Sequence, residues 1–202
     1  KVCMVGLASG VVLGTLGYTH CCIKDVAVMR SIPGITVISP ADCGETVKVA
    51  LAAINHNESV YIRLTGGAKN PSVYTDDYHF EIGKADTLQE GRDITIIAAG
   101  TMVYESLRAA EILSEQEISA TVINMHTIKP IDISVINNAC QKSKLIITVE
   151  EHSIIGGLGS AVAEYKATLK STPPQLFIGL PDKHDSAGEY KDLLERHGLT
   201  FT

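Results

Sequence analysis

The chain has 202 residues, of which 45% are hydrophobic and 20% are charged, a composition that fits a folded α/β protein with a substantial core and excludes a disordered chain. Seventeen basic and twenty-three acidic side chains give a net charge of −6 without any basic run, which argues against nucleic acid as a partner. The apolar runs are shorter than a membrane span, so no membrane partner is expected either.

The first third of the chain predicts three strands and two helices, with a glycine-rich loop after the first strand. Short apolar runs indicate strands at 2–8, 35–38 and 59–64. Apolar residues at helical spacing indicate helices at about 21–31 and 42–55. Glycines in the loop allow unusual backbone angles, so we expect this segment to cross a cleft.

The helix at 42–55 has the clearest start signal. Asp42 is a good N-cap residue, and Glu45 three residues later would complete a capping box. We expect the inward face of this helix to consist of Val47, Ala50, Leu51 and Ile54.

Residues 65–77 are rich in Gly, Asn, Pro, Ser and Asp, and they are the best candidate for a linker. The linker divides the chain into a partial domain, 1–77 with the linker included, and a second domain, 78–202. Because the chain begins with Lys1 and a strand-like run and not with methionine, we also expect that it was cut from a longer polypeptide.

Strands and helices alternate regularly after the linker. We expect strands at 94–99, 119–125, 145–150 and 175–180, helices at 104–115, 134–142, 158–170 and about 189–197, and a further edge strand at 79–82. This alternation predicts a parallel sheet covered by helices on both faces. Ligands bind at the C-terminal ends of the strands in open sheets of this kind, so we expect one rim to hold Gly100, Thr101, His126, Glu150, Glu151, His152 and Asp182.

His20 is the candidate catalytic residue. It follows the turn Gly17-Tyr18-Thr19, so its ring need not be enclosed by a regular element and can face a cleft. Imidazole is the side chain that gives and takes protons most readily near neutral pH. Taken by itself, a histidine in a loop is more often a surface or capping residue.

Several sequence blocks around and after His20 resemble a known family. The patterns G-x-T-H at 17–20, D-x-A-x-M-R-x-I-P at 25–33 and V-x-x-P-A-D at 37–42 resemble the later half of the pyrimidine-binding domain of transketolases and 1-deoxyxylulose-5-phosphate synthases. Later blocks resemble the C-terminal domain of the same enzymes, at 128–132, 149–152, 156–160 and 179–182. The resemblance covers nearly the whole chain. It implies a partial pyrimidine-binding α/β domain followed by a three-layer α/β/α C-terminal domain with a mostly parallel sheet.

The same resemblance implies the C-terminal portion, or a subunit, of a cytoplasmic, homodimeric enzyme that transfers a two-carbon ketol unit between sugars. The complete enzyme would use thiamine diphosphate and a divalent metal ion, Mg²⁺ or Ca²⁺. The family places a histidine at the position of His20 beside the cofactor, where it handles substrate protons. Its other cofactor-binding residues lie upstream or in a different domain, so we expect no cofactor and no metal ligand in this fragment, which should be inactive alone.

Some positions depart from the family pattern. The family carries another histidine at Ala8, a hydroxyl-recognising aspartate at Leu16 and a phosphate-binding arginine at Gly66, and it has a proline at Tyr18. Arg63 precedes Gly66 by three residues, and on a strand a shift by an odd number of residues turns the side chain to the opposite face. Arg63 is therefore not expected to replace the arginine of the family. These departures argue against an ordinary phosphosugar transfer. They keep open a 1-deoxyxylulose-5-phosphate synthase-like or 2-oxoacid dehydrogenase β-subunit-like enzyme, and a non-catalytic dimerisation module.

The remaining motifs have ordinary structural explanations. At 156–160 a glycine-rich turn precedes a predicted helix, as in a dinucleotide-binding motif. Val162, however, stands where that motif has its third glycine. We therefore favour tight strand–helix packing, with free N–H groups at the helix start, over nucleotide binding. Glu150 and Glu151 are neighbours on a strand and face opposite sides, so they cannot bind one metal ion together. Cys21 and Cys22 should cap and pack the first helix, and we expect all five cysteines to be free thiols.

Overall fold

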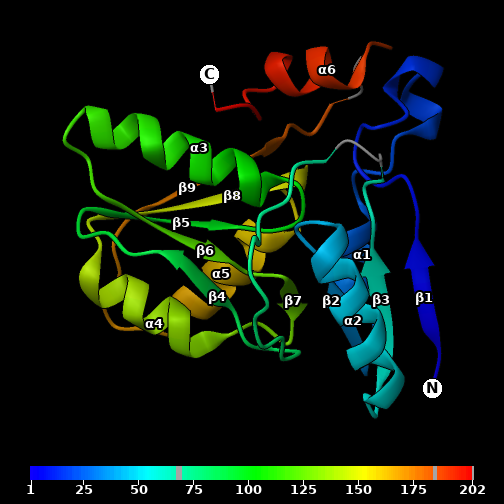
Figure 1. Ribbon diagram of the computed structural model, residues 1–202, viewed down its shortest axis with the longest axis horizontal. Helices are drawn as coiled ribbons and strands as arrows, with labels where there is room; N and C mark the ends of the chain where they lie inside the picture. Colours follow the sequence, from blue (N-terminus) through cyan, green and yellow to red (C-terminus); the bar gives the residue numbers. More distant parts are fainter. Residues whose placement is uncertain (67–69, 184–185, 202) are drawn as a thin grey trace.

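Two β-sheets form the frame of the molecule. The computed structural model describes residues 1–66, 70–183 and 186–201, and its strands run in the orders β1-β3-β2-β7 and β4-β6-β5-β8-β9 (Figure 1). The first sheet contains β1 (Cys3–Gly6), β2 (Ile35–Ile38), β3 (Ser59–Arg63) and β7 (Thr127–Lys129). The second contains β4 (Asp86–Gln89), β5 (Ile94–Ala98), β6 (Ala120–Asn124), β8 (Leu145–Ser153) and β9 (Gln175–Leu180). The pairs of β2 with β7 and of β4 with β6 are antiparallel and the other pairs are parallel, so the predicted α/β fold with a mostly parallel sheet is confirmed.

Helices cover both faces of the second sheet, with α3 on one face and α4 and α5 on the other (Figure 1). Their bounds are Met102–Glu115 for α3, Ile133–Lys142 for α4 and Leu158–Lys166 for α5. Successive residues of β5 serve the two faces: Ile96 packs in one core cluster with Met102, and Ile97 packs in another with Leu158. Because β5 is buried on both faces, its sequence is apolar except for the buried Thr95 and does not alternate. None of the helices described is long and apolar enough to cross a membrane.

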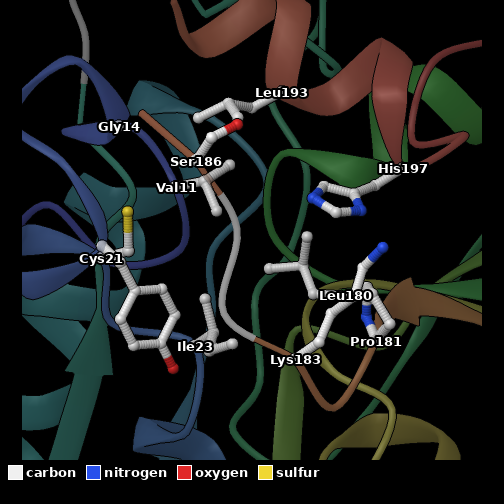
Figure 2. A pocket seen from close by; sticks show the side chains of 11 residues that line it. Val11, Gly14, Cys21, Ile23, Leu180, Pro181, Lys183, Ser186, Leu193 and His197 are labelled. Carbon is white, nitrogen blue, oxygen red and sulfur yellow. The ribbon is translucent and has the colours of Figure 1, made fainter. Parts of the chain in front are cut away.

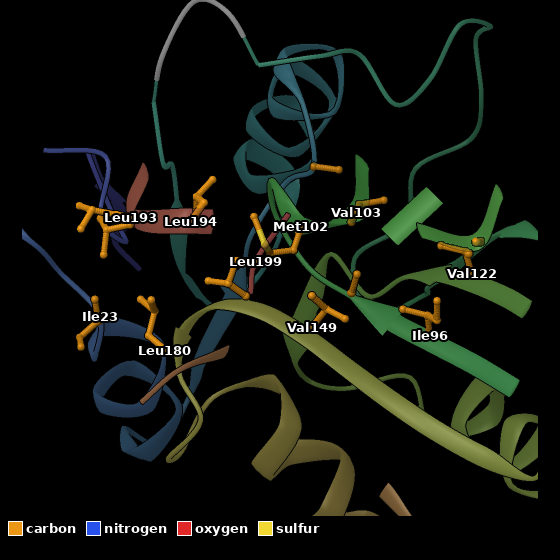
Figure 3. Close-up of a cluster of buried hydrophobic side chains, with 14 of the residues drawn as sticks. Ile23, Ile96, Met102, Val103, Val122, Val149, Leu180, Leu193, Leu194 and Leu199 are labelled. Carbon is orange, nitrogen blue, oxygen red and sulfur yellow. The ribbon is translucent and has the colours of Figure 1, made fainter. Parts of the chain in front are cut away.

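The C-terminal helix α6 (Tyr190–Arg196) extends the core toward the N-terminal part of the chain. Its Leu193 and Leu194 belong to the same buried cluster as Leu180 at the end of β9 and Ile23 just before α1 (Figure 3). Full burial of such a side chain is worth about 1.5–3 kcal/mol. The hydrophobic core is therefore shared between the two ends of the sequence.

The first sheet carries α1 (Asp25–Ser31) on one face and α2 (Cys43–Asn55) on the other, and the predicted inward face of α2 was wrong. The buried residues of the helix are Glu45, Val49 and Ala53, of which Val49 and Ala53 pack against the first sheet. Val47, Leu51 and Ile54 are 60%, 59% and 69% exposed, and Ala50 is exposed as well. The helix is apolar on two sides, and helical spacing alone does not tell which of them meets the sheet.

The predicted start of α2 is confirmed with one change. Asp42 Oδ1 accepts the N–H of Glu45 at 2.8 Å, as expected of an N-cap. Glu45 Oε2, however, accepts the N–H of Ala41 at 2.6 Å, one residue before the position that a capping box would use.

Several element boundaries differ from the sequence expectations. No strand forms at 79–82, where Phe80 and Ile82 pack against the core of the first sheet, and β4 is the edge strand instead. The unpredicted strand β7 brings residues of the second half of the chain into the first sheet. In addition, α1 begins at Asp25, α5 ends at Lys166, and β8 runs on to Ser153.

Candidate active-site loop and the junction that holds it

His20 lies on the loop that joins β1 to α1. Two short 3-10 turns, Gly14–Leu16 and Tyr18–His20, make up the loop, and Gly17 between them has a φ of 88°, which favours glycine. Hydrogen bonds between Gly10 and Cys22, at 2.8 and 2.9 Å, close its base. The side chain of His20 is exposed, and its Nδ1 lies 3.1 Å from the hydroxyl of the preceding threonine. The ring is thus open to a reactant, and its role in proton transfer stays a prediction.

The inner side of this loop packs against the C-terminal part of the chain. Val11 and Cys21 line a small pocket of about 20 Å³ together with Leu180 and Leu193 (Figure 2). All five cysteines are free, which confirms the expected absence of disulfides. Cys21 packs the loop against this core and lies several residues before α1, so the expectation that it packs the first helix was wrong.

Glu151 of β8 anchors the loop from the second sheet. Its Oε1 accepts the N–H of Val11 at 2.8 Å, and its Oε2 accepts the hydroxyl groups of Thr101 at 3.0 Å and Tyr190 at 2.8 Å. A Cβ on Gly10 would lie 2.0 Å from Oε1, so the backbone can approach this closely only because residue 10 is glycine. One buried carboxylate therefore ties together the loop, the start of α3 and the start of α6.

A buried ion pair joins β3 to the start of α1. Arg63 Nε lies 2.8 Å from Asp25 Oδ2, and the two side chains are 4% and 7% exposed. The hydroxyl of Tyr61 donates to the same carboxylate oxygen at 2.8 Å, and Arg63 donates to the carbonyl oxygen of Glu151 at 2.8 Å. Burial alone would lower the pKa of Arg63, but Asp25 and Glu151 together raise it above its ordinary value. Arg63 is therefore committed to the interior and cannot also grip a substrate phosphate.

Glu150, on the opposite face of β8, holds the start of α5. Its Oε2 accepts the N–H of Leu158 at 2.7 Å, and its Oε1 accepts the N–H of Gly159 at 2.9 Å. A Cβ on Gly157 would lie 1.9 Å from Oε2, so the predicted tight packing at this glycine turn is confirmed. The expectation of free N–H groups was wrong, because Glu150 binds them. Burial raises the pKa of Glu150 to about 7.

His152 holds α1 from the end of β8. Its Nε2 accepts the N–H of Ala27 at 3.3 Å, and its Nδ1 donates to the carbonyl oxygen of Ser153 at 2.7 Å. Burial, with the positive charge of Arg63, lowers the pKa of His152 to about 4, so the ring is neutral near pH 7. The three consecutive residues Glu150–His152 thus serve as three separate anchors and do not converge on one ion.

The predicted rim at the C-terminal ends of the second sheet forms, but the first sheet covers it. The N–H of Gly100 donates to the carbonyl of Ser39 at 3.2 Å, and the N–H of Ser39 donates to the carbonyl of His126 at 2.8 Å. The end of β2 is therefore bonded to the ends of β5 and β6. Asp182 is exposed and lies outside these contacts. In open sheets this rim is the usual ligand site, whereas here it forms a junction.

Open space lies at the ends of the first-sheet strands instead. Gly66 lines two cavities of about 550 and 300 Å³, both of which also reach Ala41, Asn70 and Thr101. A Cβ on Gly66 would lie 4.0 Å from the nitrogen of Ala8, so these two departures from the family pattern are neighbours. Leu16, the third, is 59% exposed on the loop. Cavities of this size can hold a small sugar.

The chain matches two family models that together span most of its length. They are "Transketolase, pyrimidine binding domain" over residues 1–69 and "Transketolase, C-terminal domain" over residues 83–202. A solved structure described as "Split gene transketolase, inactive beta4 tetramer" superposes with a TM-score of 0.86 at 36% identity, covering 99% of this chain and 62% of that chain.

Curated relatives give the same match. The chain is 42% identical over 201 residues to a subunit of the apulose-4-phosphate transketolase of Phocaeicola vulgatus, covering 98% of this chain and 63% of the relative. It is 40% identical over 202 residues to a subunit of the 6-deoxy-6-sulfo-D-fructose transketolase of Clostridium sp., covering 99% and 62%. It is 36% identical over 191 residues to the 1-deoxy-D-xylulose-5-phosphate synthase of Prochlorococcus marinus, covering 94% and 30%. The chain thus spans somewhat less than two thirds of the two transketolase subunits.

Proposed function

The chain belongs to the transketolase family, and from this premise we propose that it is the C-terminal portion, or a separate subunit, of an enzyme that transfers a two-carbon ketol unit between sugars. The observation that carries the proposal is the position of His20, whose ring is exposed on a fixed loop. Hydrogen bonds between Gly10 and Cys22 close the base of this loop, and Glu151 accepts a hydrogen bond from its backbone. A histidine held in this way can exchange protons with a substrate hydroxyl or carbonyl group. We further propose the domain division 1–77 and 78–202.

Thiamine diphosphate and its divalent metal ion, Mg²⁺ or Ca²⁺, would be held by residues outside this chain. When bound, the cofactor supplies the carbanion chemistry of the reaction. In the described part of the chain the starts of α2, α4 and α5 already carry the carboxylates of Asp42, Asp132 and Glu150. A diphosphate there would meet negative charge and occupied N–H groups, so these helix starts do not fit it. This supports the proposal that the part that binds the cofactor is supplied from elsewhere.

An open apolar surface supports the proposal of a partner. We use this name for the exposed apolar side chains of the β1 segment and of α2, which are at least 52% exposed: Val2, Val5, Leu7, Val47, Leu51 and Ile54. Lys1 Nζ donates to the carbonyl of Ile54 at 2.7 Å and so joins the two parts, and β1 is the edge strand of its sheet. Contiguous apolar surface beside an open strand edge is typical of an interface. We propose that the missing N-terminal portion or subunit covers it, in a homodimer of the complete enzyme that works in the cytoplasm.

Two alternatives remain. One is the 1-deoxy-D-xylulose-5-phosphate synthase branch of the enzyme class, which rests on the 36% identity to such a synthase. A non-catalytic dimerisation module is favoured by Ala8, Leu16 and Gly66, because these residues replace three groups that the family uses toward substrate. That second alternative gives His20 no task.

Two experiments test the proposed function. Calorimetric titration of the isolated chain with thiamine diphosphate and Mg²⁺ should give no tight binding; a dissociation constant of about 1 μM or lower, equivalent to roughly −8 kcal/mol, would place the cofactor site in these residues and contradict the proposal. The complete enzyme, meaning the natural polypeptide or subunit pair that contains this chain, should catalyse ketol transfer. A complete, cofactor-loaded assembly without any ketol transfer would support the dimerisation module.

A further inference from the structure

A polar cluster is buried where α2 meets the second sheet. Glu45 of α2, Asp86 of β4 and His126, just after β6, each offer one potential ligand atom, and these three atoms lie within 4.8 Å of one another. Glu45 is 0% exposed and His126 is 1% exposed. The three residues are far apart in the sequence, and no motif in the chain pointed to them.

Two buried polar atoms beside this cluster have no hydrogen-bond partner among the described residues. Asn124 donates Nδ2 to both carboxylate oxygens of Glu45, at 2.9 and 3.1 Å, and to the hydroxyl of Tyr74 at 2.8 Å, while its Oδ1 has no partner. The Nδ1 of His126 lies 2.9 Å from the hydroxyl of Thr127, and its Nε2 has no partner. Buried polar atoms are seldom left unpaired, so a missing ligand is a physical explanation for both.

The same arrangement suits a metal-binding histidine. Such a histidine binds the metal through one ring nitrogen and donates the N–H of the other to a nearby oxygen, which fixes the tautomer. If Nδ1 of His126 donates to Thr127, the lone pair of Nε2 is available for a ligand. The contact that would orient the ring is therefore already in place.

The charges of the cluster also call for a cation. Among the described residues, the side chains that donate to the two carboxylates are neutral: Glu45 accepts from Asn124 and from the hydroxyl of Tyr78 at 3.0 Å, and Asp86 accepts from the hydroxyl of Tyr74 at 2.8 Å. Lys48 Nζ is instead bound to Asp77 and to a carbonyl oxygen. Carboxylates buried together with neutral donors are costly unless a cation balances them.

We propose that Glu45, Asp86 and His126 form a binding site for a divalent transition-metal ion, Zn²⁺ being the best fit. One imidazole nitrogen and two carboxylate oxygens are ligands that Zn²⁺ accepts at about 2.0–2.2 Å, with Asn124 Oδ1 or a water molecule as a fourth ligand. Atoms now up to 4.8 Å apart must draw closer, and the half-buried Asp86 at the sheet edge would have to turn from the hydroxyl of Tyr74 toward the ion. The ion would fasten α2 of the first sheet to β4 and β6 of the second.

The test is a metal titration of the chelator-treated chain. We expect one Zn²⁺ per chain by calorimetry, and Co²⁺ in its place should give visible d–d absorption without a thiolate charge-transfer band. Asp86→Asn and His126→Gln should each weaken Zn²⁺ binding by at least about tenfold. Asp86→Asn is the decisive variant if His126→Gln does not fold, because Asp86 is only half buried.

The matched control is His56→Gln, because this histidine contacts Thr36 and lies outside the cluster. Its affinity for Zn²⁺ should equal that of the wild type. The proposal is overturned if Zn²⁺ does not bind stoichiometrically or if Asp86→Asn binds it as tightly as the wild type. It is also overturned if the His56→Gln control loses as much Zn²⁺ affinity as the cluster variants. A Co²⁺ spectrum with a thiolate band would overturn it too, because that band assigns the ion to free cysteines.

Discussion

Arg63 lies close in sequence to the position where the family carries a phosphate-binding arginine, yet its guanidinium is bound to Asp25 and to the backbone of Glu151. Replacing it with methionine would leave the carboxylate of Asp25 buried without a counter-charge. We expect Arg63→Met to lower the free energy of unfolding by about 3–5 kcal/mol, measured by urea denaturation.

Arg92 provides the control for this substitution because it is exposed. Arg92→Met should change the free energy of unfolding by no more than about 0.5 kcal/mol. The double variant Arg63→Met, Asp25→Asn should recover part of the loss, because both charges are then gone. An Arg63→Met loss as small as that of Arg92→Met would show that the buried pair does not stabilise the fold.

His152 and Glu150 give the protein opposite responses to acid. An unfolded histidine titrates near pH 6.5, whereas His152 titrates at about 4, so its contribution to stability is lost as the pH falls from about 6.5 to 4. The folded pKa of Glu150 is raised to about 7, so its contribution grows as the pH falls from about 7 toward 4.5. The two effects offset each other between about pH 4.5 and 6.5.

His152→Gln should remove the contribution of the histidine and leave that of Glu150. Glutamine does not titrate, but it can still accept a hydrogen bond from Ala27 and donate one to Ser153. Relative to the wild type, the variant should gain stability on lowering the pH from about 7 to 4, by on the order of 3 kcal/mol. Urea denaturation of both proteins at several pH values measures the difference. A difference that does not change with pH would mean that folding does not shift the pKa of His152.

Gly66 and Leu16 concern the choice of substrate. Gly66 offers no guanidinium to a phosphate, and Leu16 offers no carboxylate to a sugar hydroxyl. We therefore expect the complete enzyme to prefer a less phosphorylated or differently decorated sugar. Gly66 has a φ of 86°, which strains any side chain placed there. Gly66→Arg should therefore be compared with Gly66→Ala, which carries the same strain without the charge.

The measurement is kcat/KM for matched phosphorylated and unphosphorylated sugars. The ratio should shift toward the phosphosugar in Gly66→Arg and stay unchanged in Gly66→Ala. A wild-type enzyme that already favours the phosphosugar by orders of magnitude would contradict the expectation. Another cation would then have to bind the phosphate. Arg63 cannot do so, because it is buried in its ion pair, and the other cation near Gly66 in the sequence, Lys69, lies outside the described residues.

At the scale of elements, most strands were predictable, and the two that were missed, β4 and β7, both lie at the edge of a sheet. The buried strands β5 and β6 and the first part of β8 are mostly apolar, as expected of strands in a sheet covered on both faces, so the sequence located them well. The edge strand β4 has a mixed pattern and was missed in favour of residues 79–82. The face of α2 was misassigned because that helix has a second apolar side, which is exposed.

The C-terminal end of α3 has a residue in an unfavourable backbone conformation. Glu117 has a φ of 63°, and the bonds from its N–H to Ser114 and from the N–H of Ile118 to Leu113 form a Schellman motif, in which glycine is preferred at this position. Glu117→Gly should raise the free energy of unfolding by about 1 kcal/mol. Thermal or urea denaturation measures the gain.

The control lies two residues earlier. Glu115 is the last residue of α3, and Glu115→Gly should destabilise the protein by roughly 0.5–1 kcal/mol, because glycine is unfavourable within a helix. Opposite signs for the two glycine variants are the expected outcome. A loss of stability in both would mean that the positive φ of Glu117 carries no strain.

At the scale of the whole molecule, the sequence predicted most strands, helices and motifs, whereas only the structure showed how the loop of His20 and the two sheets contact one another. The family blocks and His20 could be found because each is a local pattern. Glu151 was expected only as one residue of a rim, and its role as an anchor could not be predicted, because Val11, Thr101 and Tyr190 lie far along the chain and only folding brings them to one carboxylate. The same applies to the proposed metal site of Glu45, Asp86 and His126, whose residues come from three separate segments of the chain.

We propose that His20, on its anchored loop, is the proton-handling group that this chain contributes to a larger ketol-transferring enzyme. The most direct measurement compares kcat at saturating substrate, and the affinity for thiamine diphosphate, in the complete wild-type enzyme and its His20→Ala variant, with His56→Ala as the control. Removal of a positioned acid–base group should lower kcat by about 10²- to 10⁴-fold while the cofactor affinity stays nearly unchanged. Full turnover in His20→Ala would contradict the account and return His20 to the role of a surface residue.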